Sequence, residues 1–332
     1  MKLARRTFTF AGAALAVGAV ATAALGRSRV QSAEESFPPI GQFVDVEGRK
    51  VHYVQEGSGP DVVLLHGAGG NLREFTFDLV GRLKDHYSVT VFDRPGMGYT
   101  DRVPEVDDSA FATEGDSPVD QADMLRKASE KLGLETPIVA GHSFGGIVSM
   151  AWANLGLDSE SPANAAAVVS LAGVLMPWPG QLGQYYRVNG SAFGGVVTIP
   201  LISALASDQR INDTIDAIFA PQPAPEGYAE YVGGQLTLRP DQFRANVRQV
   251  NTLRPHVVEM SKRYPELELP IEIVHGFDDT TVPIEVHPYE LTKIVPSANL
   301  TELPGVGHMP HHADPDATVA AIDRAASRAG LR

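Results

Sequence analysis

Short apolar runs alternate along most of the chain with longer stretches in which apolar residues recur at helical spacing. Residues 62–65 are apolar at every position, as expected for a strand buried on both faces of a parallel sheet. Other runs that predict strands are 42–46, 50–54, 88–92, 138–140, 166–171, 271–274 and 300–303, and predicted helices occupy 72–83, 118–131, 284–294 and a closing segment from 315. This alternation predicts an α/β fold with a doubly wound, mostly parallel sheet.

The alternation stops between residues 176 and 265, where helical patches are interrupted by glycine and proline. The segment is rich in aromatic residues, namely Trp178, Tyr185, Tyr186, Phe193, Phe219, Tyr228, Tyr231, Phe243 and Tyr264. We interpret it as a helical lid inserted into the sheet domain, with these side chains as apolar lining or lid core. The chain then divides into a first core part (36–175), the lid (176–265) and a second core part (266–332).

The first residues have the pattern of an export signal. Lys2, Arg5 and Arg6 precede an uncharged, alanine-rich run over 7–26, and residues 21–23 form a small-residue cleavage motif. The paired arginines resemble a twin-arginine signal, although alanine rather than serine or threonine precedes them. The sequence therefore predicts export to the periplasm or the cell exterior.

A retained membrane anchor is the alternative for the same segment. As a helix, the uncharged residues 8–25 approach the roughly 30 Å thickness of a bilayer's hydrocarbon core. Residues 28–39 are expected to form a polar, flexible linker. Under either interpretation, residues 1–35 lie outside the catalytic fold.

Composition excludes several classes of partner and site. The chain has 27 basic and 40 acidic residues, a net charge of −13, which argues against a nucleic-acid partner. It has no cysteine, so disulfides, thiolate metal sites and cysteine nucleophiles are absent. The acidic loop over 101–120 has no calcium-loop spacing and is expected to be a solvated surface loop.

Gly141-His142-Ser143-Phe144-Gly145 is the strongest chemical signal in the chain. An apolar strand leads into it and a helical pattern follows at once, which is the arrangement of a nucleophile elbow. Ser143 would occupy a strained turn, and side chains at Gly141 or Gly145 would collide with neighbouring elements.

A serine nucleophile needs a base that is oriented by an acid. Functional groups of an open parallel sheet gather at the carboxyl ends of its strands. Two later strands deliver suitable groups there: one is followed by Asp278 and Asp279, and the other by His308. The order Ser, Asp, His along the chain is the order expected for this arrangement.

Five motifs together resemble the α/β-hydrolase superfamily, of the lid-bearing esterase and epoxide-hydrolase-like type. They are residues 66–67, 93–98, 141–145, 276–283 and 307–308. The resemblance runs from about residue 42 to the C-terminus. The family's acid lies three residues after a glycine and four before a proline, which selects Asp279 over Asp278.

The resemblance implies a mechanism with named roles. Ser143 would attack an acyl carbon, His308 would transfer the proton, and Asp279 would orient the histidine. Backbone N–H groups of Phe144 and, by resemblance, Ala68 would bind the oxyanion. Epoxide hydrolases and haloalkane dehalogenases of this fold have aspartate in place of Ser143, so acyl transfer is favoured.

The expected activity is hydrolysis of a small or medium apolar carboxylic ester, thioester or lactone, without a cofactor or metal. Alternatives on the same fold are a cofactor-free perhydrolase, a carbon–carbon bond hydrolase, and an aminopeptidase using Glu226 or Glu230. A non-catalytic ligand-binding protein is the alternative of another class. His308, His311 and His312 could indicate a metal cluster, but no acidic residue or cysteine at ligand spacing completes it. His66 and Asp93 are expected to brace loops, and His142 is expected to be a packing or hydrogen-bonding residue beside the serine.

Overall fold

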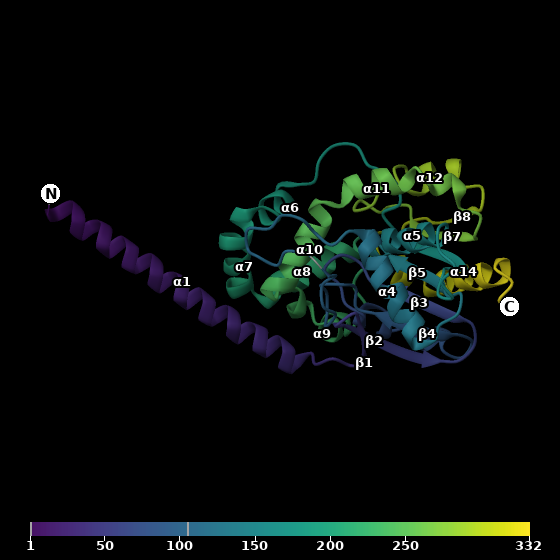
Figure 1. The fold of residues 1–332 in the computed structure, drawn as a ribbon, viewed down its shortest axis with the longest axis horizontal. Coiled ribbons are helices and arrows are strands. Elements are labelled where there is room, and N and C mark those ends of the chain that lie inside the picture. The colour runs from purple at the N-terminus through teal and green to yellow at the C-terminus, as the bar shows by residue number, and fades with distance from the viewer. Residues whose placement is uncertain (1, 105) are drawn as a thin grey trace.

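The computed structural model describes residues 2–104 and 106–332, with side chains from Gly18 onward. Its centre is an eight-stranded sheet in the order β1-β2-β4-β3-β5-β6-β7-β8 (Figure 1). The strands are β1 (Gln42–Val46), β2 (Arg49–Gly57), β3 (Asp61–Leu65), β4 (Ser88–Phe92), β5 (Ile138–His142), β6 (Ala167–Leu171), β7 (Ile271–Gly276) and β8 (Ala298–Leu303). From β4 to β8 all neighbours pair in parallel, and β1 and β2 pair antiparallel. The predicted α/β fold is confirmed.

Helices cover both faces of the sheet and produce two cores. The helices of the sheet domain are α2 (Arg73–Thr76), α3 (Leu79–Leu83), α4 (Pro118–Leu132), α5 (Phe144–Gly156), α12 (Pro288–Ile294), α13 (Pro310–Ala313) and α14 (Pro315–Arg328). Alternate residues of β3 point to opposite faces: Val63 and Leu65 pack with α4 and α5, whereas Val62 and Leu64 pack with α3 and α14. This double burial explains why the strand is apolar at every position.

Between β6 and β7 the described chain is helical. These helices are α6 (Gln184–Asn189), the π-helix η1 (Gly194–Thr198), α7 (Ile199–Leu205), α8 (Asp208–Phe219), α9 (Tyr228–Val232), the 3₁₀ helix η2 (Gly234–Leu238), α10 (Pro240–Asn251), α11 (Leu253–Ser261) and η3 (Tyr264–Glu266). We call residues 176–265 the helical insertion. Phe219 and Tyr228 form a small core of their own with Met309, which follows β8.

Four local expectations are wrong in whole or in part. The predicted helix over 72–83 is two short helices, because the backbone at Asp78 (φ −144°, ψ −52°) leaves the helical region. The helix expected from residue 284 begins only at Pro288. In the acidic loop, Asp116 is buried and pairs with Arg102 at 3.2 Å. The other described acidic residues of the loop are exposed, as expected: Asp101, Asp107, Asp108, Glu114 and Asp120.

The fourth expectation is the flexible linker over residues 28–39, most of which is helical instead. Helix α1 (Lys2–Ser36) continues through Ser36, and Ala33 is buried against the rest of the protein. Among the residues whose side chains are described, no helix is long and apolar enough to cross a membrane. Most of the run 8–25, on which the expectation of an anchor rests, lies outside those residues.

The turn between β5 and α5 holds Ser143 in an unusual conformation. Its φ is 50° and its ψ is −113°, a region that non-glycine residues rarely occupy. The turn is possible because its neighbours lack side chains. A Cβ on Gly141 would lie 2.1 Å from the Gly145 carbonyl oxygen, and one on Gly145 would lie 2.0 Å from that of Leu65. The collisions expected from the sequence are therefore present in the structure.

We expect Gly145→Ala to lower the free energy of unfolding by at least about 2 kcal/mol, because the added methyl group overlaps the backbone of β3. The matched control is Gly81→Ala, where a Cβ meets no atom within 4 Å and where alanine favours the helix. Urea unfolding of both variants tests the expectation. Equal stabilities of the two variants would contradict it.

Candidate active site

Ser143, His308 and Asp279 form a chain of hydrogen bonds. The Ser143 Oγ lies 2.9 Å from His308 Nε2, and His308 Nδ1 lies 2.7 Å from Asp279 Oδ2. The three residues come from the ends of β5, β8 and β7, as the sequence analysis expects, and all three are buried. The structure thus brings the predicted residues together, with the histidine between the hydroxyl and the carboxylate.

The loop after β7 fixes the Asp279 carboxylate. Its Oδ1 accepts hydrogen bonds from the backbone N–H groups of Thr281 (2.8 Å) and Val282 (2.9 Å), which leaves Oδ2 for His308. Asp278 is exposed beside it. Of the two neighbouring aspartates, only Asp279 contacts His308 in the described structure.

The electrostatics of these hydrogen-bonded residues favour a neutral His308 and a charged Asp279. Burial lowers the pKa of His308, and the hydrogen bond to Asp279 opposes that shift only in part. Burial alone would raise the pKa of Asp279, but the hydrogen bonds from His308 and the Val282 N–H outweigh it and lower the pKa. With Nδ1–H donated to the carboxylate, Nε2 is free to accept the hydroxyl proton.

The loop after β3 lies beside the serine. A Cβ on Gly67 would be 3.2 Å from Ser143 Cβ, so the glycine permits this close approach. Ala68 follows directly, and Phe144 is the first residue of α5, where N–H groups have no acceptor within the helix. Both N–H groups are therefore near the serine, and their role as oxyanion donors stays a prediction.

His66 and Arg94 brace this loop. His66 donates from Nδ1 to the Gly67 carbonyl (2.9 Å) and accepts the Arg94 N–H at Nε2 (3.0 Å). Burial and the nearby Arg94 charge lower the pKa of His66 to about 4, so the imidazole is neutral, as these two bonds require. The Arg94 guanidinium, fully buried, donates to the carbonyls of His66 and Gly67.

Asp93 braces segments of the chain that lie beside this loop. One carboxylate oxygen accepts the Leu72 N–H at 2.7 Å, and the other accepts the Tyr99 N–H at 2.8 Å and contacts His52. The expected bracing by His66 and Asp93 agrees with these contacts.

The helical insertion also holds the loop after β3, through contacts that the sequence does not indicate. Asn246 of α10 accepts the Gly69 N–H at 2.7 Å, and the Thr237 hydroxyl donates to the Gly69 carbonyl. Gln222 accepts the Gly307 N–H at 3.1 Å, next to His308. An isolated asparagine or glutamine in a helical segment gives no sequence signal for such contacts.

Glu74 is a further residue of the site that the sequence does not indicate. Its Oε1 lies 2.7 Å from Nδ1 of His142, whose Nε2 lies 2.9 Å from the His308 carbonyl oxygen. Its other oxygen accepts the Gly67 N–H at 3.4 Å. Burial opposes both charges, but their mutual attraction raises the pKa of His142 and lowers that of Glu74. This buried ion pair connects the loop after β3, the elbow and the His308 loop.

Glu74, His142 and His311 are also the residues that could hold a metal. Their ligand atoms all lie within 4.8 Å of one another, and carboxylate and imidazole groups are zinc ligands. The expectation that no acidic residue completes the histidine cluster is wrong, because folding places Glu74 Oε1 3.5 Å from His311 Nε2. The Glu74–His142 ion pair gives two of these residues a structural role without an ion.

The chain belongs to the alpha/beta hydrolase family, which it matches over residues 62–321. Several solved structures share the fold, among them an esterase from a Rhodococcus species with 22% identity and a TM-score of 0.64. That similarity covers 87% of this chain and 99% of the other. The family resemblance inferred from the five motifs is confirmed.

Two curated relatives differ in how much of their length is similar to this chain. Haloalkane dehalogenase 2 of Mycobacterium tuberculosis is 24% identical over 86% of this chain and 94% of its own. A dihydrolipoyllysine-residue acetyltransferase component of an acetoin cleaving system, from Cupriavidus necator, is 33% identical over 42% of this chain and 34% of its own. The match to the second protein therefore leaves most of that protein outside the comparison.

We expect Asp279→Asn to lower kcat for ester hydrolysis by about 10³–10⁴-fold, because an amide can hold the wrong tautomer of His308. Asp278→Asn is the matched control, since Asp278 is exposed and adjacent. Steady-state kinetics of both variants provide the measurement. Similar losses in the two variants would show that Asp279 has no special role.

The pH dependence follows from the lowered pKa of His308. Protonation removes the base, so kcat/KM should be level at neutral pH and fall about tenfold per pH unit on the acid side. Because the pKa is lowered, the inflection should lie below 6.5, the ordinary value for histidine. A pH profile of kcat/KM for a neutral ester measures it; an inflection above that value would be inconsistent with the buried base.

Proposed function

We propose that this protein is a serine hydrolase that cleaves a small or medium apolar carboxylic ester, thioester or lactone through an acyl-enzyme on Ser143. The observation that carries the proposal is the bonded chain of Ser143, His308 and Asp279. Membership in a family of hydrolytic enzymes supports it. The three substrate types share an acyl carbon bonded to a leaving group, which is what a serine nucleophile attacks.

The reaction would have two halves. His308 takes the Ser143 proton as the oxygen attacks the acyl carbon, and the N–H groups of Ala68 and Phe144 stabilise the oxyanion. His308 then gives its proton to the leaving alcohol or thiol, and the acyl group stays on Ser143. Water, deprotonated by His308, hydrolyses this ester and releases the acid. Asp279 stabilises the imidazolium in both halves.

The residue at position 143 separates this proposal from dehalogenation. The dehalogenase relative indicates that the family supports that chemistry. Dehalogenases of this fold attack carbon with an aspartate to form an ester, whereas a serine would form an ether that water cannot readily cleave. Serine at position 143 thus favours acyl transfer.

The helical insertion would act as a lid that determines substrate preference. Its contacts with Gly69 and Gly307 place it against both loops that flank Ser143. We further propose that residues 1–35 direct the protein out of the cytoplasm, by export or as an anchor, on the basis of the basic residues before the uncharged run 7–26.

Turnover of p-nitrophenyl acetate and butyrate tests the proposed activity. Ser143→Ala should lower kcat by at least about 10⁴-fold, because no other group can form the acyl-enzyme. Ser58→Ala, at an exposed serine, should retain the parent rate. Background turnover by the parent protein across an ester, thioester and lactone panel would overturn the proposal and favour a non-catalytic binding protein.

A further inference from the structure

Large apolar side chains gather on one exposed part of the helical insertion. Phe193 is 60% exposed and Leu205 is 65% exposed. The full set in this part, which we call the apolar surface, is Tyr185, Val188, Phe193, Val196, Leu201 and Leu205. Single exposed apolar residues are ordinary, but a concentration in one segment indicates a contact surface. The expectation that Tyr185 and Phe193 line a pocket or the lid core is wrong, since both are more than half exposed.

A neighbouring loop extends the apolar surface. Phe111, at 72%, is more exposed than any other large apolar residue of the described side chains. Its loop lies against η1, because a Cβ on Gly195 would be 2.1 Å from the Ala110 carbonyl oxygen. Two segments far apart in sequence thus present apolar side chains at the same end of the protein.

Helix α1 passes this end of the protein and continues away from it (Figure 1). A cavity of about 320 Å³ is lined by Thr22, Ala23 and Arg27 of α1 together with Pro200 of α7. Pro200 therefore lies at the level where the uncharged run 7–26 ends and the charged residues Arg27 and Arg29 begin. In a membrane-inserted helix, such a transition marks the boundary between hydrocarbon and headgroups.

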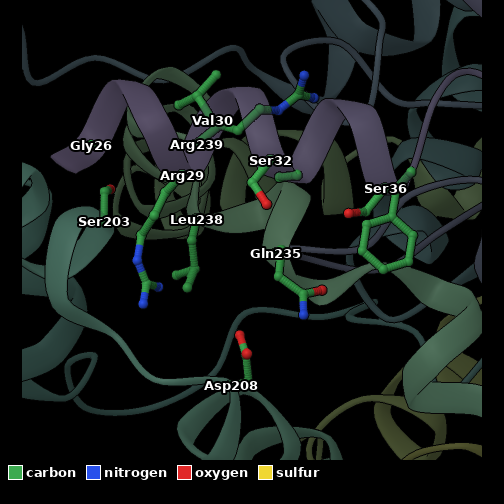
Figure 2. A pocket seen from close by; sticks show the side chains of 12 residues that line it. Gly26, Arg29, Val30, Ser32, Ser36, Ser203, Asp208, Gln235, Leu238 and Arg239 are labelled. Atoms are coloured by element: carbon green, nitrogen blue, oxygen red, sulfur yellow. The ribbon is translucent and has the colours of Figure 1, made fainter. Parts of the chain in front are cut away.

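Specific contacts fix α1 at this level. Glu34 pairs with Arg239 at 2.7 Å, and the Arg29 guanidinium donates to the Ala206 carbonyl at the end of α7. Figure 2 shows Arg29 of α1 beside Leu238 of η2, at a second cavity of about 300 Å³. Because α1 is held against the insertion, the direction of α1 in a bilayer would determine which surface of the protein faces the lipid.

We propose that the apolar surface contacts the surface of a lipid bilayer in which the N-terminal part of α1 is embedded. Helix α7 lies at the headgroup level defined by Arg27 and Arg29, so Leu201 and Leu205 can enter the interface. Arginines beyond the uncharged run can reach anionic headgroups. This contact rests on the proposed role of residues 1–35 as an anchor and not on the proposed esterase activity, so the contact and the activity can fail separately.

The absence of cysteine allows a direct test, because one introduced cysteine is labelled uniquely. Phe193→Cys and Leu205→Cys, each carrying an NBD fluorophore, are made in the full chain and reconstituted into phosphatidylcholine–phosphatidylglycerol vesicles. His86→Cys is the control, because His86 is exposed two residues before β4, at the edge of the sheet opposite the carboxyl ends of the strands. Circular dichroism checks that each labelled variant is folded.

The labels at 193 and 205 should shift to shorter wavelength with lipid and lose intensity when the vesicles contain doxyl-labelled lipid. The label at 86 should do neither. Failure of the full chain to associate with vesicles would overturn the proposal. So would labels at 193 and 205 that respond no more than the control, or a shift that depends on protein concentration without lipid, which would indicate a second copy on this surface.

Discussion

The structure depends on a single tight turn, in which Ser143 is held in a conformation that its own backbone disfavours. The turn persists because α5 lies so close to β3 that Gly145 touches the Leu65 carbonyl. Further bonds tie the turn to the sheet: the Ser143 N–H donates to Leu171 of β6, and its carbonyl accepts from Gly146 and Val174. The strain is thus offset by packing and hydrogen bonds within the sheet domain, and the hydroxyl is held toward His308.

The groups around this turn form a continuous buried network. Asp279 orients His308 from one side, and the Glu74–His142 pair holds the His308 backbone from another. Burial alone would neutralise such charges, so each is retained by an adjacent partner. The helical insertion joins the network through Asn246 and Gln222. A change in the position of the insertion would therefore alter contacts with both loops beside the serine.

Periodicity and local motifs were sufficient to predict the sheet, the elbow and the residues that surround it. Residues 62–65 could be placed because burial on both faces requires apolar residues throughout, and the glycines around Ser143 have a steric purpose that sequence reveals. Glu74 could not be predicted, since nothing local distinguishes a buried glutamate from a solvated one. Its partner His142 is far away in sequence. The continuation of α1 through Ser36 was also missed, because contacts with Arg239 and Ala206 favour the helix there rather than local preference.

In the proposed reaction, Ser143 becomes acylated during turnover. The protein is mixed with p-nitrophenyl butyrate, the reaction is quenched rapidly, and peptide mass mapping then locates the acyl group. We expect a burst of p-nitrophenol stoichiometric with protein and a butyryl group on the peptide that contains Ser143. Butyrylation of another residue, or a burst that persists in Ser143→Ala, would contradict it.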